Sequence, residues 1–415
     1  MEWKEVRLGD VVEIVNGFAF KSKAFTLEGI PVIKIKNIKA GKVILNDLDY
    51  ISTSDINPKY TKIRSSDILI TMTGNRMDGS PETWVGKVSL FRHQGDFYLN
   101  QRVSALRLID DSVDNNFLSY YLSSWQSQLY FALNSNSSGG QANITPAVVQ
   151  EYRLMVPELE TQRSIASILS SLDQKIELNN KINADLEEMA QAIFKNWFVD
   201  FEPFKDGKFV DSELGMIPEG WKVGRADDFY QINIGKTPPR KEHKWFSTNP
   251  ADKIWVSIAN MGNSGIFISD SSEYLTKEAV DRHNIIMVPR NTILLSFKLT
   301  VGRVAIADKE LTTNEAIARF ILSDDKYMEY LYLYLKNFDY NSLGSTSSIA
   351  TAVNSKTIKG IQMLQPSDKI IDAFHIQVNP IFEKIRSLTK ENSRLSSLRD
   401  TLLPRLMSGE LEVPE

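Results

Sequence analysis

Six motifs occur twice along the 415-residue chain, in the same order in each half, and this duplication constrains the fold more than any other feature. Trp3, Asp10 and Gly17 recur as Trp221, Asp228 and Gly235. The other matches are Ile33-Lys34-Ile35-Lys36-Asn37 with Val256-Ser257-Ile258-Ala259-Asn260, Ile68-Leu69 with Ile293-Leu294, Val85-Gly86-Lys87-Val88 with Val301-Gly302-Arg303-Val304, Asn100 with Asn314, and Pro157 with Pro366. The order is kept while the offset drifts between 209 and 225, which is typical of duplicated globular units whose loops differ in length.

The largest change in offset, from 225 to 216, falls on residues 73–84, a polar segment that the second half almost lacks. Two modules that share a scaffold but differ in such a segment are suited to reading different targets. The alternative is ordinary loop divergence, which is common at any single loop.

Each half is expected to form a mixed α+β globule in which short strands precede an amphipathic helix. The expected strands are Val11–Val15, Ile30–Ile35 and Val103–Leu108 in the first half and Ile317–Leu322 in the second. The expected helices place Phe117, Tyr121, Leu122, Trp125 and Leu129 on one face in the first half, and Tyr330, Leu331, Tyr334 and Leu335 in the second. We expect these aromatic stripes to lie in the cores of the globules.

A heptad-like pattern follows each globule and predicts a long helix. The seam residues are Ile165, Leu169, Leu172, Ile176, Asn179, Asn183, Leu186, Ala190, Ile193 and Trp197, and then Phe374, Val378, Ile381, Ile385, Leu388, Asn392, Leu395, Arg399, Leu402 and Leu406. Steps of three and four residues average 3.5, which is the spacing of a coiled-coil seam. The first helix would be roughly 60 Å long at about 1.5 Å per residue, and Pro203 prevents much continuation. The two helices are predicted to pair antiparallel, with one globule at each end.

Polar residues and prolines mark particular points in these helices. Asn183 and Asn392 occupy equivalent seam positions, where a buried asparagine favours one register; the alternative is that each side chain turns to solvent. Asn379-Pro380 has the pattern of an N-cap followed by a first-turn proline, so a break in the second helix is predicted near 379–380. Pro404 is expected to disturb the last turn, and Gly409 to end the helix.

The chain lacks the residue patterns of common enzymes and metal sites. It has no cysteine, and its four histidines (93, 243, 283 and 375) show no metal-ligand spacing. Neither GxxxxGK[ST] nor GxGxxG occurs, and there is no Asp-Pro-Pro-Tyr-like run of an amino-methyltransferase. No apolar run approaches the about 20 residues that span a bilayer, and the charged N-terminus does not resemble a signal peptide. We expect a non-catalytic, cytoplasmic binding protein without a metal.

The formal net charge of −4 at first argues against a nucleic-acid partner, but the charge is segregated along the chain. Residues 18–42 carry six lysines and one acid, residues 236–244 carry four lysines or arginines and one acid, and residues 200–219 are acidic. Salt screening confines each field to about 10 Å at moderate ionic strength, so local charge decides. The two basic stretches indicate phosphate-binding surfaces or, alternatively, solvated surface strips.

Several short motifs, taken in order, resemble the specificity subunits of type I restriction-modification systems. They are Asn16–Ser22, Leu99–Val103, Gly235–Arg240, Asn196–Phe201 and Leu402–Glu410. The resemblance covers essentially the whole chain, and it implies two target-recognition domains that each read half of a bipartite DNA site. It implies double-stranded DNA, two methylation subunits and restriction subunits as partners. S-adenosylmethionine, ATP and Mg²⁺ would then be bound by those partners, so that this chain is a non-catalytic subunit of a DNA adenine methyltransferase and endonuclease.

Side-chain chemistry selects candidates for the DNA contacts, because Lys and Arg suit phosphates and guanine while Asn and Gln suit adenine. The candidates are Lys21, Lys23, Lys36, Asn37, Asn75, Arg76, Gln101 and Arg102 in the first module, and Lys236, Thr237, Arg240, Lys241, Asn260 and Lys298 in the second. Ser135–Asn143 and Gly344–Ser348 are further candidate loops, or simply connectors. Trp197, Phe198 and Phe201 either seal the helix pair or contact a methylation subunit.

The predicted organisation is therefore two α+β target-recognition domains related by a pseudo-two-fold repeat and separated by an antiparallel coiled coil. The domains are residues 1–157 and 220–366, the spacer helices residues 158–200 and 367–409, the linker residues 201–219 and the C-terminal tail residues 410–415. The alternative function is a two-headed coiled-coil adaptor that binds proteins and has no role at DNA.

Overall fold

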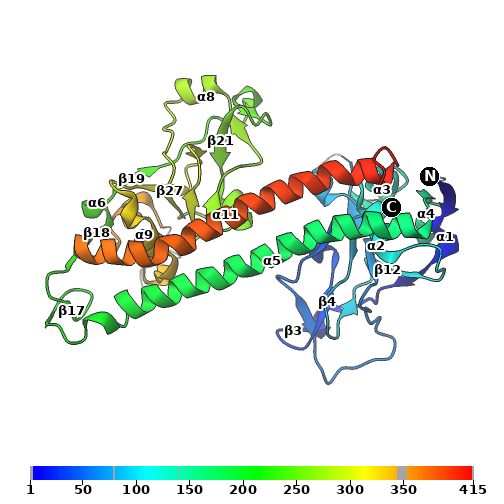
Figure 1. Ribbon diagram of the computed structural model, residues 1–415, viewed down its shortest axis with the longest axis horizontal. Helices are drawn as coiled ribbons and strands as arrows, with labels where there is room; N and C mark the ends of the chain where they lie inside the picture. Colours follow the sequence, from blue (N-terminus) through cyan, green and yellow to red (C-terminus); the bar gives the residue numbers. More distant parts are fainter. Residues whose placement is uncertain (1–2, 78–79, 139, 344–352, 414–415) are drawn as a thin grey trace. The chain divides into compact units, whose positions relative to one another are not determined.

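A computed structural model of the chain describes residues 3–77, 80–138, 140–343 and 353–413. They form two compact units (Figure 1): unit 1 is Met1–Ile176 with Arg394–Glu415, and unit 2 is Glu177–Ser393. Each unit holds one α+β module and one stretch of each long helix, α5 (Leu159–Phe198) and α11 (Asp368–Met407). The predicted α+β fold class with two modules is confirmed.

The main sheet has the same strand order in both modules. In unit 1 the order is β10 (Val88–Leu90), β8 (Ile68–Thr71), β12 (Val103–Leu108) and β2 (Val12–Asn16). In unit 2 the corresponding order is β25 (Val304–Ala307), β24 (Ile293–Ser296), β27 (Ile317–Ile321) and β19 (Gln231–Ile234), with β22 (Phe267–Ile268) added beside β25. Strands β8 and β24 are buried along their whole length, as their continuous apolar runs require.

A second sheet repeats in the same way. Its order is β11 (Tyr98–Leu99), β4 (Ile30–Ile33), β7 (Asp49–Ile51) and β3 (Phe25–Thr26) in unit 1, and β26 (Thr312–Thr313), β21 (Lys253–Val256), β23 (Tyr274–Leu275) and β20 (Phe246–Ser247) in unit 2. In each sheet the first pair is parallel and the others are antiparallel. Each module is closed by one further antiparallel pair, β1 (Lys4–Arg7) with β15 (Arg153–Val156), or β18 (Lys222–Arg225) with β28 (Gln362–Gln365). The duplication read from the sequence is therefore structural.

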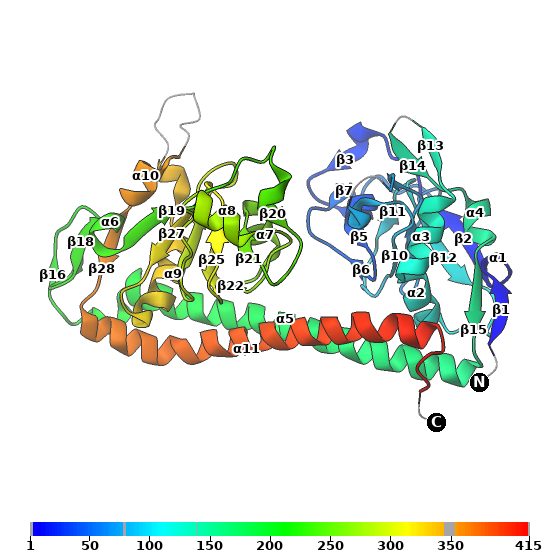
Figure 2. The ribbon, with the colours of Figure 1, turned by 90° about the horizontal axis from the view of Figure 1, so that it is seen from above.

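Unit 1 carries an additional three-stranded sheet, in the order β13 (Asn136–Ser138), β14 (Gln141–Asn143) and β9 (Thr73–Asn75). It joins the two polar segments that the sequence singled out, residues 73–84 and 135–143, and the Thr73 hydroxyl donates to Asn143 Oδ1 at 2.8 Å. Strands β13 and β14 lie at the side of the module remote from α5 (Figure 2). The corresponding candidate loop of the second half, Gly344–Ser348, lies outside the described residues.

The amphipathic helix predicted in the first half is in fact two helices, α2 (Asn115–Ser123) and α3 (Trp125–Leu133). Ser124 interrupts it because its hydroxyl accepts from the Ser127 backbone N–H and caps α3. As a result Trp125 turns outward and is 51% exposed, so its predicted core position is wrong. In unit 2 the single helix α9 (Met328–Asn337) has Tyr330 and Leu331 fully buried, as predicted.

Short helices and strands complete the modules. They are α1 (Leu8–Val11), β5 (Ile38–Lys39), β6 (Lys42–Val43) and α4 (Pro146–Gln150) in unit 1, and β16 (Phe209–Val210), β17 (Ile217–Pro218), α6 (Ala226–Phe229), α7 (Ile258–Asn263), α8 (Lys277–Arg282) and α10 (Ser355–Lys359) in unit 2. The segment expected as a plain linker, residues 201–219, thus contains a small β16–β17 hairpin, and Phe201, Phe204 and Ile217 from it pack in the core of unit 2. No helix within the described ranges has the length and apolarity of a membrane span.

Segments of the two long helices run antiparallel inside each unit. In unit 2, Asn179 of α5 meets Asn392 of α11, and Phe198 meets Phe374. In unit 1, Asp173 meets Arg399, and Leu169 shares a core cluster with Leu406. In both units a later residue of α5 thus faces an earlier residue of α11.

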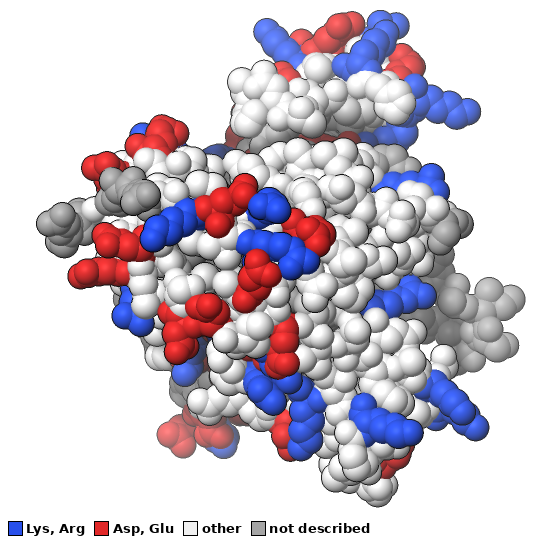
Figure 3. Space-filling model, turned by 90° about the vertical axis from the view of Figure 1, so that its right-hand side faces the viewer, with Lys and Arg blue, Asp and Glu red and all other residues white. Residues whose placement is uncertain are grey.

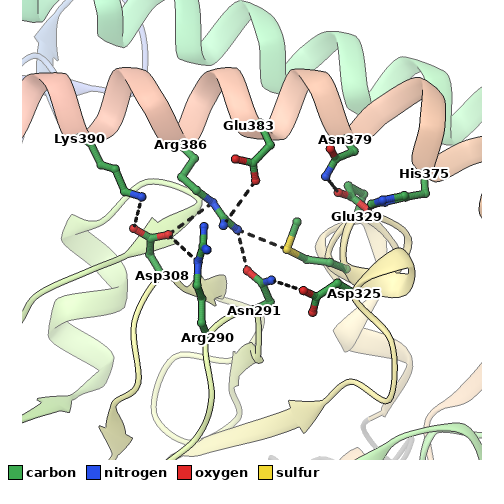
Figure 4. A network of polar contacts seen from close by, with 11 residues as sticks. Arg290, Asn291, Asp308, Asp325, Glu329, His375, Asn379, Glu383, Arg386 and Lys390 are labelled. Atoms are coloured by element: carbon green, nitrogen blue, oxygen red, sulfur yellow. Dashed lines mark hydrogen bonds and ion pairs between the residues drawn. The ribbon is translucent and has the colours of Figure 1, made fainter.

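The break predicted near 379–380 is wrong, because α11 is one helix from Asp368 to Met407. Asn379 does not cap a new helix; its amide donates to the buried Glu329 carboxylate at 2.9 Å (Figure 4). Buried apolar residues on both sides of the proline, Phe374 and Val378 before it and Phe382 and Ile385 after it, hold the helix against the module. This packing offsets the about 3 kcal/mol that an internal proline costs. The helix also runs past Pro404, and Gly409, with φ +73°, follows its end as predicted.

Candidate nucleic-acid interface

Seven of the eight residues predicted to contact DNA in the first module are exposed. One of them, Lys36, is held in an ion pair, and the other six are Lys21, Lys23, Asn75, Arg76, Gln101 and Arg102. The fold brings several of them together from distant parts of the sequence. The Gln101 backbone N–H donates to Phe18 O at 2.9 Å, the Met72 N–H donates to Arg102 O at 2.9 Å, and Asn75 pairs with Gln141 across β9 and β14. Gln101 and Arg102 therefore lie between the first basic stretch, residues 18–42, and the additional sheet of β9, β13 and β14.

The other two predicted residues of the first module serve the fold. Asn37 is 1% exposed: its Oδ1 accepts from the Lys34 backbone N–H, and its Nδ2 donates to the carbonyls of Ile44 and Asn46. No amide group is left to read a base. Lys36 is exposed, but Asp47 and Asp49 lie 2.9 and 3.2 Å from its ammonium, and the hydrogen bond to Asp47 raises the pKa of Lys36.

In the second module three of the predicted residues are already bound to neighbouring groups. Lys236 donates to the carbonyl of His283 at 2.5 Å, and the hydroxyl of Thr237 donates to Glu315. Arg240 makes two parallel hydrogen bonds to Glu273, at 2.8 and 3.0 Å, and its guanidinium lies over the rings of Phe246 and Trp255. Such a stacked, bidentate pair has little positive charge left to offer a ligand.

The remaining predicted residues of the second module divide in the same way. Asn260 repeats the role of Asn37, because its Oδ1 accepts from the backbone N–H of Ser257 at 2.9 Å. Lys241 and Lys298 are exposed, and among the described residues no carboxylate lies within 4.0 Å of either ammonium. Lys298 precedes Leu299, which is fully exposed with φ +61°, at the point where the second half has no counterpart of residues 73–84. These two lysines are exposed, and no side-chain hydrogen bond or ion pair of the described residues holds them.

Trp197, Phe198 and Phe201 seal the core of unit 2. Phe198 is 5% exposed, its ring lies 4.8 Å from that of Phe374, and Trp197 and Phe201 are partly buried in the same cluster. These contacts agree with the first alternative drawn from the sequence, sealing of the helix pair, and they leave Phe198 with little exposed surface.

The expected equivalence of Asn183 and Asn392 does not make them partners. Asn392 instead accepts from Asn179 Nδ2 and donates to Asn180 Oδ1, both at 2.9 Å, while Asn183 Oδ1 is buried and has no hydrogen-bond partner in the described structure. In an antiparallel pair, contact depends on position relative to the midpoint and not on equivalence in a repeat. The polar layer predicted for the seam exists, but it is formed by Asn179, Asn180 and Asn392.

The basic side chains of this molecule differ in whether an acidic partner neutralises them. On the face in Figure 3, lysine and arginine side chains lie among acidic ones and not in one continuous basic field. Two basic residues that the sequence interpretation did not select, Lys87 and Arg303, are buried or partly buried and have no carboxylate of the described residues within 4.0 Å. The repeated Val-Gly-basic-Val motif was the available signal, because it keeps a cation at the same place in both halves.

The described residues contain no group of three or more histidine, aspartate or glutamate side chains that could hold a metal ion. Each module carries amides, hydroxyls, lysines and arginines on its loops and strand ends, beside carboxylates that pair with some of them. These groups suit hydrogen bonding to a polyanion and to base edges.

Comparison with known proteins shows which family this architecture resembles. The family model described as the type I restriction modification DNA specificity domain matches residues 1–188 and 218–377, once in each half. Among curated relatives, the type I restriction enzyme HindI specificity subunit of Haemophilus influenzae is 28% identical, with 99% of this chain and all of the relative covered. The MjaIX specificity subunit of Methanocaldococcus jannaschii is also 28% identical, with 100% of this chain and 94% of the relative covered.

A solved structure, the type I restriction-modification S subunit from M. genitalium, has the same fold. It aligns with a TM-score of 0.56 and 15% sequence identity over 98% of this chain and 96% of that one. The two family matches coincide with the two modules described above. The chain belongs to the type I restriction-modification DNA specificity family.

Proposed function

We propose that this chain is the DNA sequence-specificity subunit of a type I restriction-modification complex, and that each module reads one half of a bipartite DNA target. The observation that carries the proposal is the repetition of one two-sheet scaffold with different polar elements on it, in a chain of the DNA specificity family. A shared scaffold presents both modules to DNA in the same way. The differing elements, above all β9 with β13 and β14 in unit 1, then read different bases.

Accessible amides and cations support this assignment in the first module. Gln101 and Arg102 lie beside the polar sheet that holds Asn75 and Gln141, which together supply donors and acceptors for base edges. A β-ribbon can enter the major groove of B-DNA, and β13 and β14 form such an antiparallel pair at one edge of the three-stranded sheet. Exposed Lys21 and Lys23 would contact phosphates, which hold the module in register without reading the sequence.

We further propose that the long helices bind two methylation subunits. Large apolar side chains stand exposed on them: Ile168, Leu178, Met189, Ile376 and Leu398, with exposed fractions from 36 to 74%. Burial of such side chains against a partner is favourable by about 25 cal/mol per Å². The methylation subunits would carry S-adenosylmethionine, the restriction subunits would carry ATP and Mg²⁺, and this chain would supply no catalytic group. The complex would act on DNA in the cytoplasm.

The decisive experiment is to co-express the chain with its methylation subunit and map the modified adenines by sequencing. Two short specified blocks separated by an unspecified gap are expected. Replacement of residues 1–157 by the corresponding module of another family member should change one block and leave the other intact. A change in both blocks, or methylation without sequence preference, would contradict the assignment of one module to one half-site.

A two-headed protein adaptor is the competing function, and salt dependence separates the two. The DNA-reading function requires that affinity for duplex DNA falls steeply as salt rises, because bound phosphates release counterions. An adaptor would show no DNA affinity with this dependence. Methylation of DNA by the isolated chain would instead reveal a catalytic site and overturn the non-catalytic assignment.

A further inference from the structure

Lys87 and Arg303 occupy equivalent backbone positions in the two modules, with the same hydrogen bonds around them. The Lys87 N–H donates to the hydroxyl of Thr71 at 2.9 Å, and the Arg303 N–H donates to the hydroxyl of Ser296 at 3.0 Å. The preceding glycines, Gly86 at φ +79° and Gly302 at φ +91°, donate to the carbonyls of the same Thr71 and Ser296. The strand register agrees, since Val88 pairs with Ile70 and Val304 with Leu295. The two cations are structural equivalents.

Lys87 is buried without a compensating charge. Its side chain belongs to a residue only 7% exposed, and no carboxylate of the described residues lies within 4.0 Å of its ammonium. Burial of an unpaired ammonium destabilises a folded protein, so the fold gains nothing from it. The charged groups that face it are Lys39 of β5 and, more weakly, Glu82. Burial, and then the field of Lys39, lowers the pKa of Lys87 to about 8, which Glu82 opposes.

Arg303 is held in the corresponding place in unit 2. Its Nη1 donates to the carbonyl of Ile258 at 2.7 Å, and the guanidinium lies so close to Gly262 that a Cβ there would be 2.3 Å from Nη1. Gly262 is the sequence counterpart of Lys39, and Ile258 is the counterpart of Ile35. No carboxylate of the described residues lies within 4.0 Å of the guanidinium of Arg303. Each module therefore keeps one cation without an acidic partner beside the turn that follows β4 or β21.

We propose that Lys87 and Arg303 are paired phosphate-binding residues, one in each module, that hold equivalent backbone phosphates of the two half-sites. This inference rests on the proposed function. Modules that read different half-sites can share only contacts that do not depend on sequence, and phosphate contacts have that property. Lys36 and Arg240, which lie in the basic stretches, are already neutralised by Asp47, Asp49 and Glu273, whereas these two cations are not.

A phosphate contact at Lys87 has a signature in pH. The phosphate favours the ammonium form, so the pKa of Lys87 is higher in the complex than the value of about 8 in the free chain. Binding then takes up a proton above pH 8. Affinity for DNA is full below about pH 8 and falls as pH rises above it, by up to about tenfold per pH unit until the pKa of the bound state is reached. Arginine, whose pKa exceeds about 12, would abolish this fall while keeping the charge.

The test uses the complex with the methylation subunit and two duplexes, one with the mapped target and one with both half-sites scrambled. Binding is measured by fluorescence anisotropy for wild type, Lys87→Met, Lys87→Arg and Arg303→Met. The salt concentration runs from about 50 to about 300 mM, where counterion release dominates the affinity. Lys205→Met, which removes an exposed lysine paired with Glu202, is the matched control. Thermal unfolding of each variant establishes that it is folded.

Lys87→Met and Arg303→Met are each expected to weaken binding to both duplexes by a similar factor and to reduce the slope of log affinity against log salt by about one. Lys87→Arg is expected to keep the slope and to lose the fall in affinity above pH 8. Weakening for the target duplex alone would show a base contact and overturn the inference, as would an unchanged salt slope in both Met variants. If wild type itself has no salt-dependent affinity for DNA, the proposed function fails instead.

Discussion

The guanidinium of Arg386 lies 3.4 Å from the carboxylate of Asp308, and both side chains are almost fully buried where α11 packs on the module of unit 2 (Figure 4). The ammonium of Lys390 and the guanidinium of Arg290 approach the same carboxylate at 3.3 and 3.5 Å, and Arg386 also donates to Asn291 Oδ1 at 2.7 Å. Asp308 directly follows β25, the strand that begins at Val304, the residue after Arg303. A buried ionic cluster thus joins the long helix to the sheet of its own module.

Removal of one partner of this buried pair should strongly destabilise unit 2. Asp308→Asn leaves Arg386 buried without a countercharge and is expected to lower the free energy of unfolding by about 3–5 kcal/mol, measured by urea denaturation. Arg290→Ala, which removes a partner that is half exposed, should cost about 1 kcal/mol or less. Equal losses in the two variants would show that the buried pair is not the principal link.

The asparagine layer in the helix pair should behave as a coupled unit. Asn392→Leu removes the side-chain oxygen that accepts a hydrogen bond from Asn179, which is fully buried. The free energy of unfolding is expected to fall by about 1–3 kcal/mol. Asn179→Leu with Asn392→Leu should recover most of that loss, because both partners become apolar. A double-mutant cycle from urea denaturation measures the coupling, and strictly additive losses would mean that the two amides do not interact.

Burial of Glu329 makes the stability of unit 2 depend on pH. Its carboxylate accepts from Asn379 Nδ2 and lies 2.8 Å from His375 Nδ1, and burial raises its pKa above the usual 4.5 despite these two hydrogen bonds. The folded chain therefore holds this proton to higher pH than the unfolded chain. The stabilisation is complete below about pH 4.5 and is lost as pH rises through the raised pKa.

Glu329→Gln should therefore gain stability relative to wild type as pH increases from 4 to 8, over roughly the window set by this linkage. The measurement is a series of urea denaturation curves across that range, with Glu278→Gln on α8 as the exposed control. A difference between Glu329→Gln and wild type that stays constant with pH would contradict the linkage.

Gly235 should tolerate no side chain. A Cβ at this residue would lie 1.9 Å from the carbonyl oxygen of Asn314, as one at Gly17 would lie 2.1 Å from that of Asn100. Gly235→Ala must push the end of β19 away from Thr313 and Asn314, at a cost of about 2 kcal/mol or more. Gly265→Ala, with no atom within 4 Å of the new Cβ, is the control. Thermal unfolding should separate the two variants, and equal midpoints would be inconsistent with this close approach.

Lys87→Met should stabilise the free chain while it weakens DNA binding. The pKa of Lys87 is lowered to about 8 from 10.5, so the folded chain binds fewer protons than the unfolded chain between these values. The destabilisation is complete below pH 8 and disappears as pH rises through 10.5. The variant is expected to gain about 1–3 kcal/mol at pH 7 and progressively less toward pH 10.5. A loss of stability at pH 7 would indicate that Lys87 supports the fold.

The repeated scaffold was predictable because its signals are local and periodic. The apolar runs at Ile68–Thr71 and Ile293–Ser296 became the buried central strands, and the 3.5-residue spacing became α5 and α11. The failures also have local causes. Asn379-Pro380 has the pattern of a helix start, but packing of Phe382 and a hydrogen bond to Glu329 from another element overrule it.

The candidate site was less predictable, because a surface residue's availability depends on partners that are distant in the chain. Lys36 and Arg240 lie in basic stretches of the sequence, yet Asp49 and Glu273 reach them from segments distant in the chain. Asn37 and Asn260 have the amides that adenine would require, but both are consumed as turn caps.

The residue order by itself therefore settled the duplication, the modules and the family, since repetition and hydrophobic period survive in one dimension. Only the three-dimensional packing decided which charges are neutralised and which amides are free. It also decided that Lys87 and Arg303 have no acidic partner among the described residues. Ion pairing and burial require groups within a few ångströms, and the sheets that bring those groups together join segments from across each module.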